Sequence, residues 1–107
     1  MGKLLYGMSG IEIGFDDRVL AHLQVVIGAK LRRGESFYFS WKDDPNVGDG
    51  RSTIWLSAAV PLYFKYSGGK MPALNREWIE ALVVSSNSGQ GLQLTEEIRP
   101  SGQVTGG

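Results

Sequence analysis

The feature that most constrains this chain is a stretch at residues 16–41 that reads DDRVLAHLQVVIGAKLRRGESFYFSW. Its apolar residues recur at the spacing of one helical face, and they are Val19, Leu20, Leu23, Val26, Ile27 and Leu31. Two aspartates stand at its start and Lys30, Arg32 and Arg33 near its end, where the helix dipole favours each charge. Gly34 can adopt the left-handed conformation that ends a helix. The stretch therefore predicts a long amphipathic helix followed by an aromatic strand.

Alternating apolar and polar residues predict short strands before and after this helix. We expect them at residues 3–6, 11–15, 36–42, 51–56 and 62–66, with a last short one at 92–94. A second helix should begin after an N-cap at Asn75 and end near Ser86. The order β-β-α-β-β-β-α predicts an α+β fold, an antiparallel sheet of about five strands with both helices packed on one face.

The connections between the third, fourth and fifth predicted strands are short and rich in turn residues, which favours an antiparallel meander. In that arrangement the inward-facing side chains and the helix faces would form one core. The predicted core residues are Leu20, Leu23, Ile27, Phe37, Phe39, Ile54, Phe64, Trp78 and Leu82.

The length and composition indicate one folded domain. The chain has 107 residues, of which 42% are apolar and 10% aromatic, the usual size of a single domain with its own core. We expect this domain to span residues 1–94. From Thr95 the chain turns to Glu, Pro, Ser, Gly and Thr, so we expect residues 95–107 to be a disordered tail.

The charge balance and the lack of cysteine exclude several classes of site. Eleven basic and eleven acidic side chains leave no net charge, so a polyanion would need a local basic patch. With no cysteine, there is no disulfide, thiolate metal site or cysteine nucleophile. No apolar run reaches the length of a signal peptide or a membrane span. We expect a cytoplasmic protein that does not engage a membrane.

Three segments invite a chemical interpretation, and each has a simpler structural one. The loop at residues 43–50 (DDPNVGDG) has part of a calcium-loop spacing, but it lacks the closing bidentate Glu, and we interpret it as a hairpin loop. Ser67-Gly68-Gly69-Lys70 lacks the full Walker spacing, and we interpret it as a connection. His22 is the only histidine, and we expect it to be part-exposed beside the apolar face. The sequence predicts no catalytic residue, no metal ligand and no cofactor.

Four segments carry a family resemblance: the stretch at 16–41, the opening MGKLLYG, the segment Ile54-Trp55-Leu56 and LNREWIEAL from Leu74. Over residues 1–94 the chain resembles a group of small actinobacterial proteins. Members of that group often carry the name ATP-dependent DNA ligase or have no known function. Ligase activity would need a lysine nucleophile in a Lys-x-Asp-Gly-x-Arg motif. The nearest match is Val47-Gly48-Asp49-Gly50-Arg51, with valine at the lysine position.

A predicted open face of the sheet is the main candidate for function. Five residues should point away from the helices: Tyr38, Lys42, Trp55, Tyr63 and Lys65. Exposed large aromatics indicate an interaction surface. Tyr and Trp are enriched at protein interfaces, which favours self-association, as a homodimer, or a protein partner. Aromatics flanked by lysines also stack single-stranded nucleic acid, and an accessory nucleic-acid-binding protein, linked to DNA ligation through the family resemblance, is the alternative.

We predict that the protein does not form a covalent adenylate, because no lysine stands where the ligase nucleophile is required. The purified chain would be incubated with magnesium and ATP labelled at the α-phosphate, with an active DNA ligase as a positive control. The label should stay in solution, and a lysine-linked labelled adduct would overturn this interpretation.

Overall fold

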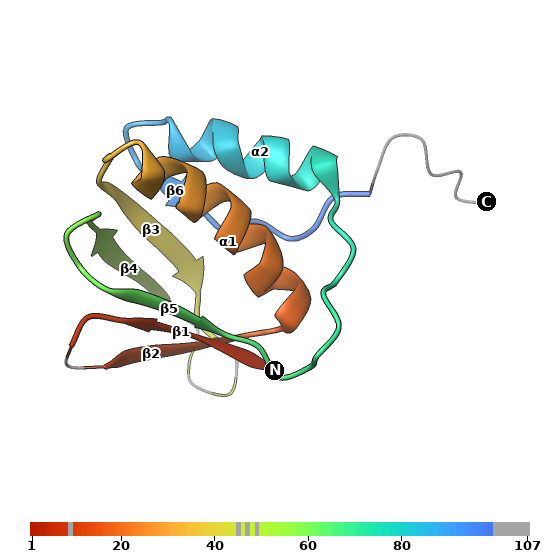
Figure 1. The fold of residues 1–107 in the computed structure, drawn as a ribbon. Helices are drawn as coiled ribbons and strands as arrows, with labels where there is room; N and C mark the ends of the chain where they lie inside the picture. Colours follow the sequence, from red (N-terminus) through yellow and green to blue (C-terminus); the bar gives the residue numbers. More distant parts are fainter. Residues whose placement is uncertain (9, 45, 47, 49, 100–107) are drawn as a thin grey trace. The chain divides into compact units, whose positions relative to one another are not determined.

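A computed structural model describes residues 1–8, 10–44, 46, 48 and 50–99 of the chain. Its elements are β1 (Gly2–Tyr6), β2 (Ile11–Phe15), α1 (Asp17–Arg32), β3 (Phe37–Lys42), β4 (Arg51–Leu56), β5 (Leu62–Lys65), α2 (Arg76–Ser86) and β6 (Leu92–Gln93), as Figure 1 shows. The fold is α+β, which confirms the predicted class, and the predicted order of elements is also confirmed, with β6 following α2.

The prediction of one sheet of about five strands is wrong. The described strands form two three-stranded sheets, ordered β2-β1-β5 and β4-β3-β6. The predicted meander is wrong for the same reason, because β5 pairs with β1 and not with β4. Only the β3–β4 hairpin of that meander is present. The short connection between β3 and β4 correctly indicated an antiparallel pair, but the short connection between β4 and β5 did not, because the partner of β5 is the earlier strand β1.

The chain forms two compact units, each built from two separate segments. The first unit comprises Met1–Glu35 and Ser57–Leu74, and the second comprises Ser36–Leu56 and Asn75–Gly107. Because the chain passes from one unit to the other after Glu35, Leu56 and Leu74, no single cut would separate them. A single domain over residues 1–94 stays a prediction.

In the first unit, β1 is the central strand and pairs antiparallel with both β2 and β5. Leu4 of β1 is fully buried and lies directly across from Ile13 and Phe64. Helix α1 packs on this side of the sheet, so closely that a Cβ on Gly2 would lie 2.8 Å from a methyl group of Leu20. One face of the β2-β1-β5 sheet is therefore covered by α1, and the other face is open.

The second unit has a related arrangement. It also consists of a hairpin, a helix and a third strand that pairs with the first strand of the hairpin, but here β6 runs parallel to β3. Gly91 precedes β6 with a φ of +82°, and a Cβ there would lie 2.4 Å from the carbonyl oxygen of Tyr38. Only glycine fits this approach of the two backbones, which positions β6 beside β3.

The ends of both helices agree with the residues predicted to form them. Gly34 has a φ of +76°, as expected for the glycine that ends α1. The Oδ1 of Asn75 accepts a hydrogen bond from the backbone N–H of Trp78 at 3.2 Å, which confirms Asn75 as the N-cap of α2. Asp16 precedes α1 without a side-chain capping bond. Asp16 therefore stabilises the start of α1 through its negative charge near the helix dipole and not through a hydrogen bond.

Asn75 also joins the start of α2 to the beginning of the predicted tail. Its Nδ2 donates to the Oε2 of Glu97 at 2.9 Å and to the carbonyl oxygen of Ile98 at 2.6 Å. The indole nitrogen of Trp78 donates to Thr95 at 3.2 Å. These residues have no regular secondary structure, but they bond to α2. Residues 100–107 lie outside the described residues, so the disorder of the tail stays a prediction.

Most of the predicted core is confirmed. The buried residues of that set are Leu20, Leu23, Ile27, Phe37, Phe39, Trp78 and Leu82. Ile54 and Phe64 are only half-buried, because each lies on a strand at the edge of its own sheet. Within the described part of the chain, no helix is both long enough and apolar enough to cross a membrane.

We predict that Leu23→Ala will lower the free energy of unfolding by about 2–5 kcal/mol, because it leaves a cavity at a fully buried position. Val25→Ala is the matched control on the same helix, since Val25 is 40% exposed and should change stability by less than about 1 kcal/mol. Urea titration of both variants measures the difference. Equal losses would show that the buried face of α1 is assigned incorrectly.

Candidate functional site

The five residues predicted to share one open face belong to two different sheets. Tyr38, Lys42 and Trp55 lie on β3 and β4 of the second unit. Tyr63 and Lys65 lie on β5 of the first unit, opposite Leu5 and Lys3 of β1. The expectation that Tyr63 would lie on a strand next to Trp55 is therefore wrong, because it depended on the meander.

On the second unit, the predicted residues belong to an open face that we call the aromatic–cation face. Residues paired directly across β3 and β4 point to the same side of the sheet. The face consists of three such pairs, Tyr38 with Trp55, Ser40 with Thr53 and Lys42 with Arg51. The other side of the same strands carries the buried residues Phe37, Phe39, Trp41 and Leu56.

Tyr38 and Trp55 form an exposed aromatic pair at one end of this face. Their ring centroids are 4.9 Å apart and their planes are at 70°, an edge-to-face contact. Each side chain remains 50% exposed. Half of each side chain is thus accessible from solvent at the same end of the face.

Lys42 and Arg51 form the cationic end of the face. Both are exposed and lie directly across from each other, and among the described residues neither lies within 4.0 Å of a carboxylate. The neighbouring carboxylate of Asp43 accepts a hydrogen bond from Ser52 at 2.6 Å, on the other side of the sheet. At about 3.3 Å per residue, the cations lie roughly 13 Å along the strand from the aromatic pair.

The middle of the face is a pair of hydroxyl groups. Ser40 is buried and its Oγ lies 2.8 Å from the Oγ1 of Thr53. Thr53 itself is exposed. Arg51 was missed in the sequence analysis, although it has the same alternation as Thr53 and Trp55 on one strand. This alternation along the strand was the signal that could have identified Arg51 as a residue of the face.

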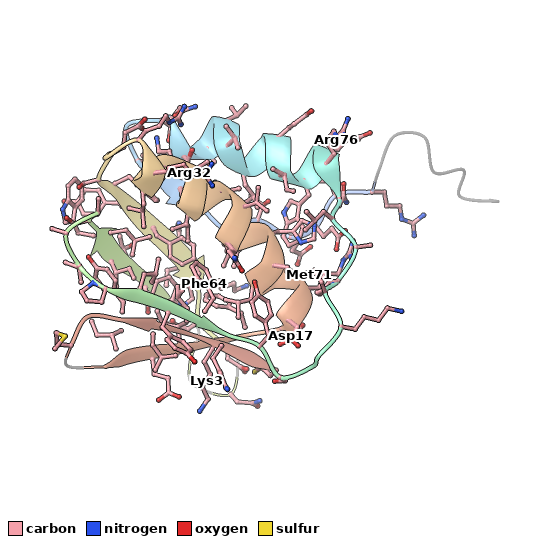
Figure 2. All side chains as sticks on the ribbon, viewed as in Figure 1. Lys3, Asp17, Arg32, Phe64, Met71 and Arg76 are labelled. Atoms are coloured by element: carbon pink, nitrogen blue, oxygen red, sulfur yellow. The ribbon has the colours of Figure 1, made fainter. Side chains whose placement is uncertain are left out.

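The open side of the first unit has a different character, and we call it the lysine face. Its residues are Lys3, Leu5, Glu12, Tyr63 and Lys65, and Tyr63 is 58% exposed. The ammonium group of Lys3 lies 2.5 Å from the carboxylate of Glu12. In Figure 2, Lys3 lies on the side of the sheet away from α1, whereas Phe64 lies on the α1 side. This face therefore carries its own ion pair.

The loop between β3 and β4 is a hairpin loop, as predicted. The Oδ1 of Asp44 accepts a hydrogen bond from the N–H of Asn46 at 2.8 Å, and the Asp44 carbonyl accepts one from Gly48 at 3.2 Å. These bonds use the aspartate to shape the turn. In the described part of the chain, no group of three or more His, Asp or Glu side chains is placed to hold a metal ion.

The connection after β5 is held by a carboxylate of its own chain. The N–H groups of Gly68 and Ser67 donate to the two oxygens of Asp17 at 2.8 and 3.0 Å. Arg18 adds a bond from its guanidinium to the carbonyl of Ala73 at 2.7 Å. Two of the N–H groups that a phosphate-binding loop would offer to a ligand are thus occupied by Asp17. Gly68 first and then Ser67 hold the pKa of Asp17 below its usual value near 3.8.

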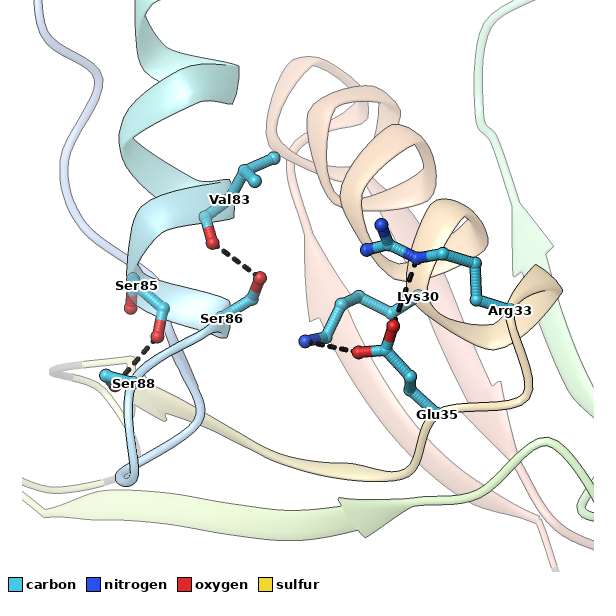
Figure 3. A network of polar contacts seen from close by, with 7 residues as sticks. All are labelled: Lys30, Arg33, Glu35, Val83, Ser85, Ser86 and Ser88. Carbon is cyan, nitrogen blue, oxygen red and sulfur yellow. Dashed lines mark hydrogen bonds and ion pairs between the residues drawn. The ribbon is translucent and has the colours of Figure 1, made fainter.

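Two other polar residues of α1 are buried. His22, expected to be part-exposed, is fully buried, and its Nδ1 lies 2.6 Å from the carbonyl oxygen of Arg18. Lys30 is also buried, and its ammonium group lies 2.9 Å from Glu35. Glu35 also contacts Arg33 at 3.1 Å, and its pKa is lowered, first by the bond from Lys30. Figure 3 shows this network after the end of α1.

Comparison with known proteins gives a family but no activity. Residues 1–97 match the model of a family described as a domain of unknown function, DUF7882. No curated protein and no solved structure matches the chain. The match spans both units, including the residues of both open faces.

The two hydrogen bonds that Asp17 accepts predict that the free energy of unfolding depends on pH in the acidic range. Because the pKa of Asp17 is lower in the folded chain, the unfolded chain binds more protons at low pH. This contribution to stability is complete above the unfolded pKa near 3.8 and is lost as the pH falls through the lower folded value. Asp17→Asn should therefore flatten the dependence of the unfolding free energy on pH below about 4.

Asp16→Asn is the matched control for this experiment. It removes the same charge from the adjacent position, but Asp16 makes no side-chain capping bond. Thermal unfolding of both variants and of the unmodified chain would be followed across the acidic range. If Asp16→Asn flattened the curve as much as Asp17→Asn, the effect would come from the helix dipole and not from the bonds to Ser67 and Gly68.

Proposed function

Since the chain belongs to the DUF7882 family, whose function is unknown, we propose a function from its surface chemistry: it is an interaction module that binds single-stranded nucleic acid on the aromatic–cation face. The observation that carries this proposal is the combination, on one open sheet face, of a half-exposed Tyr38–Trp55 pair with two cations that have no carboxylate within 4.0 Å among the described residues.

Stacking is the first part of the argument. Single-stranded nucleic acid exposes the faces of its bases, and proteins that bind it without sequence preference stack those faces on aromatic side chains. Trp55 and Tyr38 offer such ring surface at adjacent positions of neighbouring strands. Because every base has a π-face, we expect little sequence preference.

Charge is the second part of the argument. Lys42 and Arg51 lie along the same strands as the aromatic pair, at a distance of about 13 Å that a short extended oligonucleotide can span. Arginine binds a phosphate through two parallel hydrogen bonds. The chain has no net charge, so binding depends on this local patch and should be weak and sensitive to salt.

The same charges argue against self-association through this face. A two-fold dimer uses the same surface twice, so it would bring together Lys42 and Arg51 of both copies, and the three residue pairs of the face include no carboxylate to balance them. A protein partner would have to supply acidic groups. A link to DNA ligation rests on the family resemblance alone, and it carries no residue into this site.

The test is the fluorescence anisotropy of a labelled oligodeoxythymidine titrated with the protein. Trp55→Ala should weaken binding by about 1–3 kcal/mol, or about 5- to 150-fold, through lost stacking. For two phosphate contacts on a single strand, the logarithm of affinity should fall against the logarithm of salt with a slope of about −1.4. Arg51→Gln should roughly halve that slope.

Lys3→Gln is the matched control, because it removes one positive charge from the lysine face of the first unit. Circular dichroism would check that each variant remains folded. No binding by the unmodified chain at low salt would overturn the proposal. Equal weakening by Lys3→Gln and Arg51→Gln would also overturn it, since only bulk charge would then matter.

A further inference from the structure

Strand β4 places an aromatic ring, a hydroxyl group and a guanidinium group in a line along the aromatic–cation face. They belong to Trp55, Thr53 and Arg51, and all three residues are exposed. Because alternate residues of a strand point to the same side of the sheet, each lies about 7 Å along the strand from the next. The proposed function uses only the two ends of this line, with a base on the ring and a phosphate on the cation.

The hydroxyl group of Thr53 is held in place from below. Its Oγ1 lies 2.8 Å from the Oγ of Ser40, which is buried directly across from it on β3. Threonine is also β-branched, so its χ1 angle has few alternatives. Ser40 is therefore a positioning residue, because it fixes the Thr53 hydroxyl group on a side chain that is itself exposed.

This pair of hydroxyl groups leaves Thr53 able to make a further hydrogen bond. A hydroxyl group has one hydrogen to donate and two lone pairs that accept, and either oxygen of the pair can be the donor. When Ser40 donates, the hydrogen of the Thr53 hydroxyl group can be donated to a ligand. When Thr53 donates, its lone pairs can accept a hydrogen from a ligand. A ligand group that both donates and accepts therefore matches Thr53 in either state.

We propose that the nucleic acid bound on the aromatic–cation face is single-stranded RNA, and that Thr53 binds a ribose 2′-hydroxyl group. This inference rests on the proposed function and names its ligand. The sugar joins the base to the phosphate in every nucleotide, so a strand with a base on Trp55 and a phosphate on Arg51 passes a sugar over Thr53. The 2′-hydroxyl group both donates and accepts, and it is the group by which a protein distinguishes RNA from DNA.

Other groups of a nucleic acid fit the Thr53 position less well. Deoxyribose has only hydrogen on its 2′ carbon, so it can neither donate to Thr53 nor accept from it. A phosphate oxygen only accepts, and Lys42 and Arg51 already offer it two cations at one end of the face. A preference for ribose also requires no contact with base edges, which agrees with the weak sequence preference expected from stacking.

The test compares two labelled oligonucleotides of equal length, oligouridylate and oligodeoxyuridylate, which differ only in the 2′-hydroxyl group. Fluorescence anisotropy at low salt should show that the unmodified chain binds the RNA about 2- to 10-fold more tightly, the net effect of one hydrogen bond. A 2′-fluoro oligouridylate keeps the sugar shape of RNA but cannot donate, so it should bind like the DNA. If it bound like the RNA, sugar shape would explain the preference and the proposal would be overturned.

Thr53→Val removes the hydroxyl group but keeps a branched side chain. The ratio of RNA affinity to DNA affinity should fall to about one in this variant, because the bond to the 2′-hydroxyl group is lost. Thr53→Ser retains a hydroxyl group and should keep the preference for RNA. Trp55→Ala and Arg51→Gln should weaken the binding of both nucleic acids alike, so neither should change the ratio.

Gln93→Leu is the matched control for a polar group elsewhere on the second unit's sheet. Gln93 lies on β6 directly across from Ser40, about 10 Å from Thr53 at the usual spacing of strands. Its Nε2 donates to the side-chain oxygen of Gln90 at 2.6 Å. The substitution should leave the ratio of the two affinities unchanged. If it abolished the preference while Thr53→Val did not, the assignment to Thr53 would be wrong.

Failure of this inference can be distinguished from failure of the proposed function. Equal binding of RNA and DNA by the unmodified chain would overturn the inference and leave the proposed function intact. Binding of neither would overturn the proposed function and the inference together. If Thr53→Val weakened both equally, Thr53 would contact a phosphate or only stabilise the sheet, and the inference would again be overturned. Circular dichroism would check the folding of each variant, and the 2′-fluoro comparison needs no variant at all.

Discussion

The pairing of β5 with β1 is the constraint on which the rest of this structure depends. It joins Ser57–Leu74 to Met1–Glu35 and makes β1 a central strand with hydrogen bonds on both edges. The other hairpin, β3–β4, then completes its sheet with β6 instead of β5. One choice of strand partner therefore decides that there are two small sheets, and decides which aromatic residues share a face.

The division into two sheets gives each open face its own chemistry. The aromatic–cation face has an edge-to-face aromatic pair and two cations that have no acidic partner among the residues that the structure describes. The lysine face has the Lys3–Glu12 ion pair and Lys65, which has no carboxylate within 4.0 Å in the described part of the chain. The first combination suits a polyanion with planar groups, whereas on the second face the carboxylate of Glu12 is already engaged by Lys3.

These local positive surfaces exist although the net charge is zero, because several acidic side chains form hydrogen bonds or ion pairs elsewhere in the structure. Asp17 accepts two backbone N–H bonds, Asp43 accepts from Ser52, and Glu12 and Glu35 contact lysines. Lys42, Arg51 and Lys65 are left without carboxylates in the described part of the chain. A balanced composition is thus compatible with local positive surfaces.

The sequence by itself determined the elements and their order. The helical period of Leu20, Leu23 and Ile27, the cap at Asn75 and the alternation along each strand act over a few residues, so they can be identified without a tertiary structure. Alternation also determined which side of β3 and β4 is buried, and hence that Tyr38 and Trp55 point the same way.

Only the tertiary structure decided which strands pair. Alternation is the same whichever partner a strand takes, so nothing local distinguishes β1 from β4 as the partner of β5. Contacts between distant segments separate Tyr63 from Trp55 and bury His22. They also bring Ser67 and Gly68 to Asp17. Such contacts depend on how the whole chain packs, and the spacing of apolar residues within one segment contains no information about that packing.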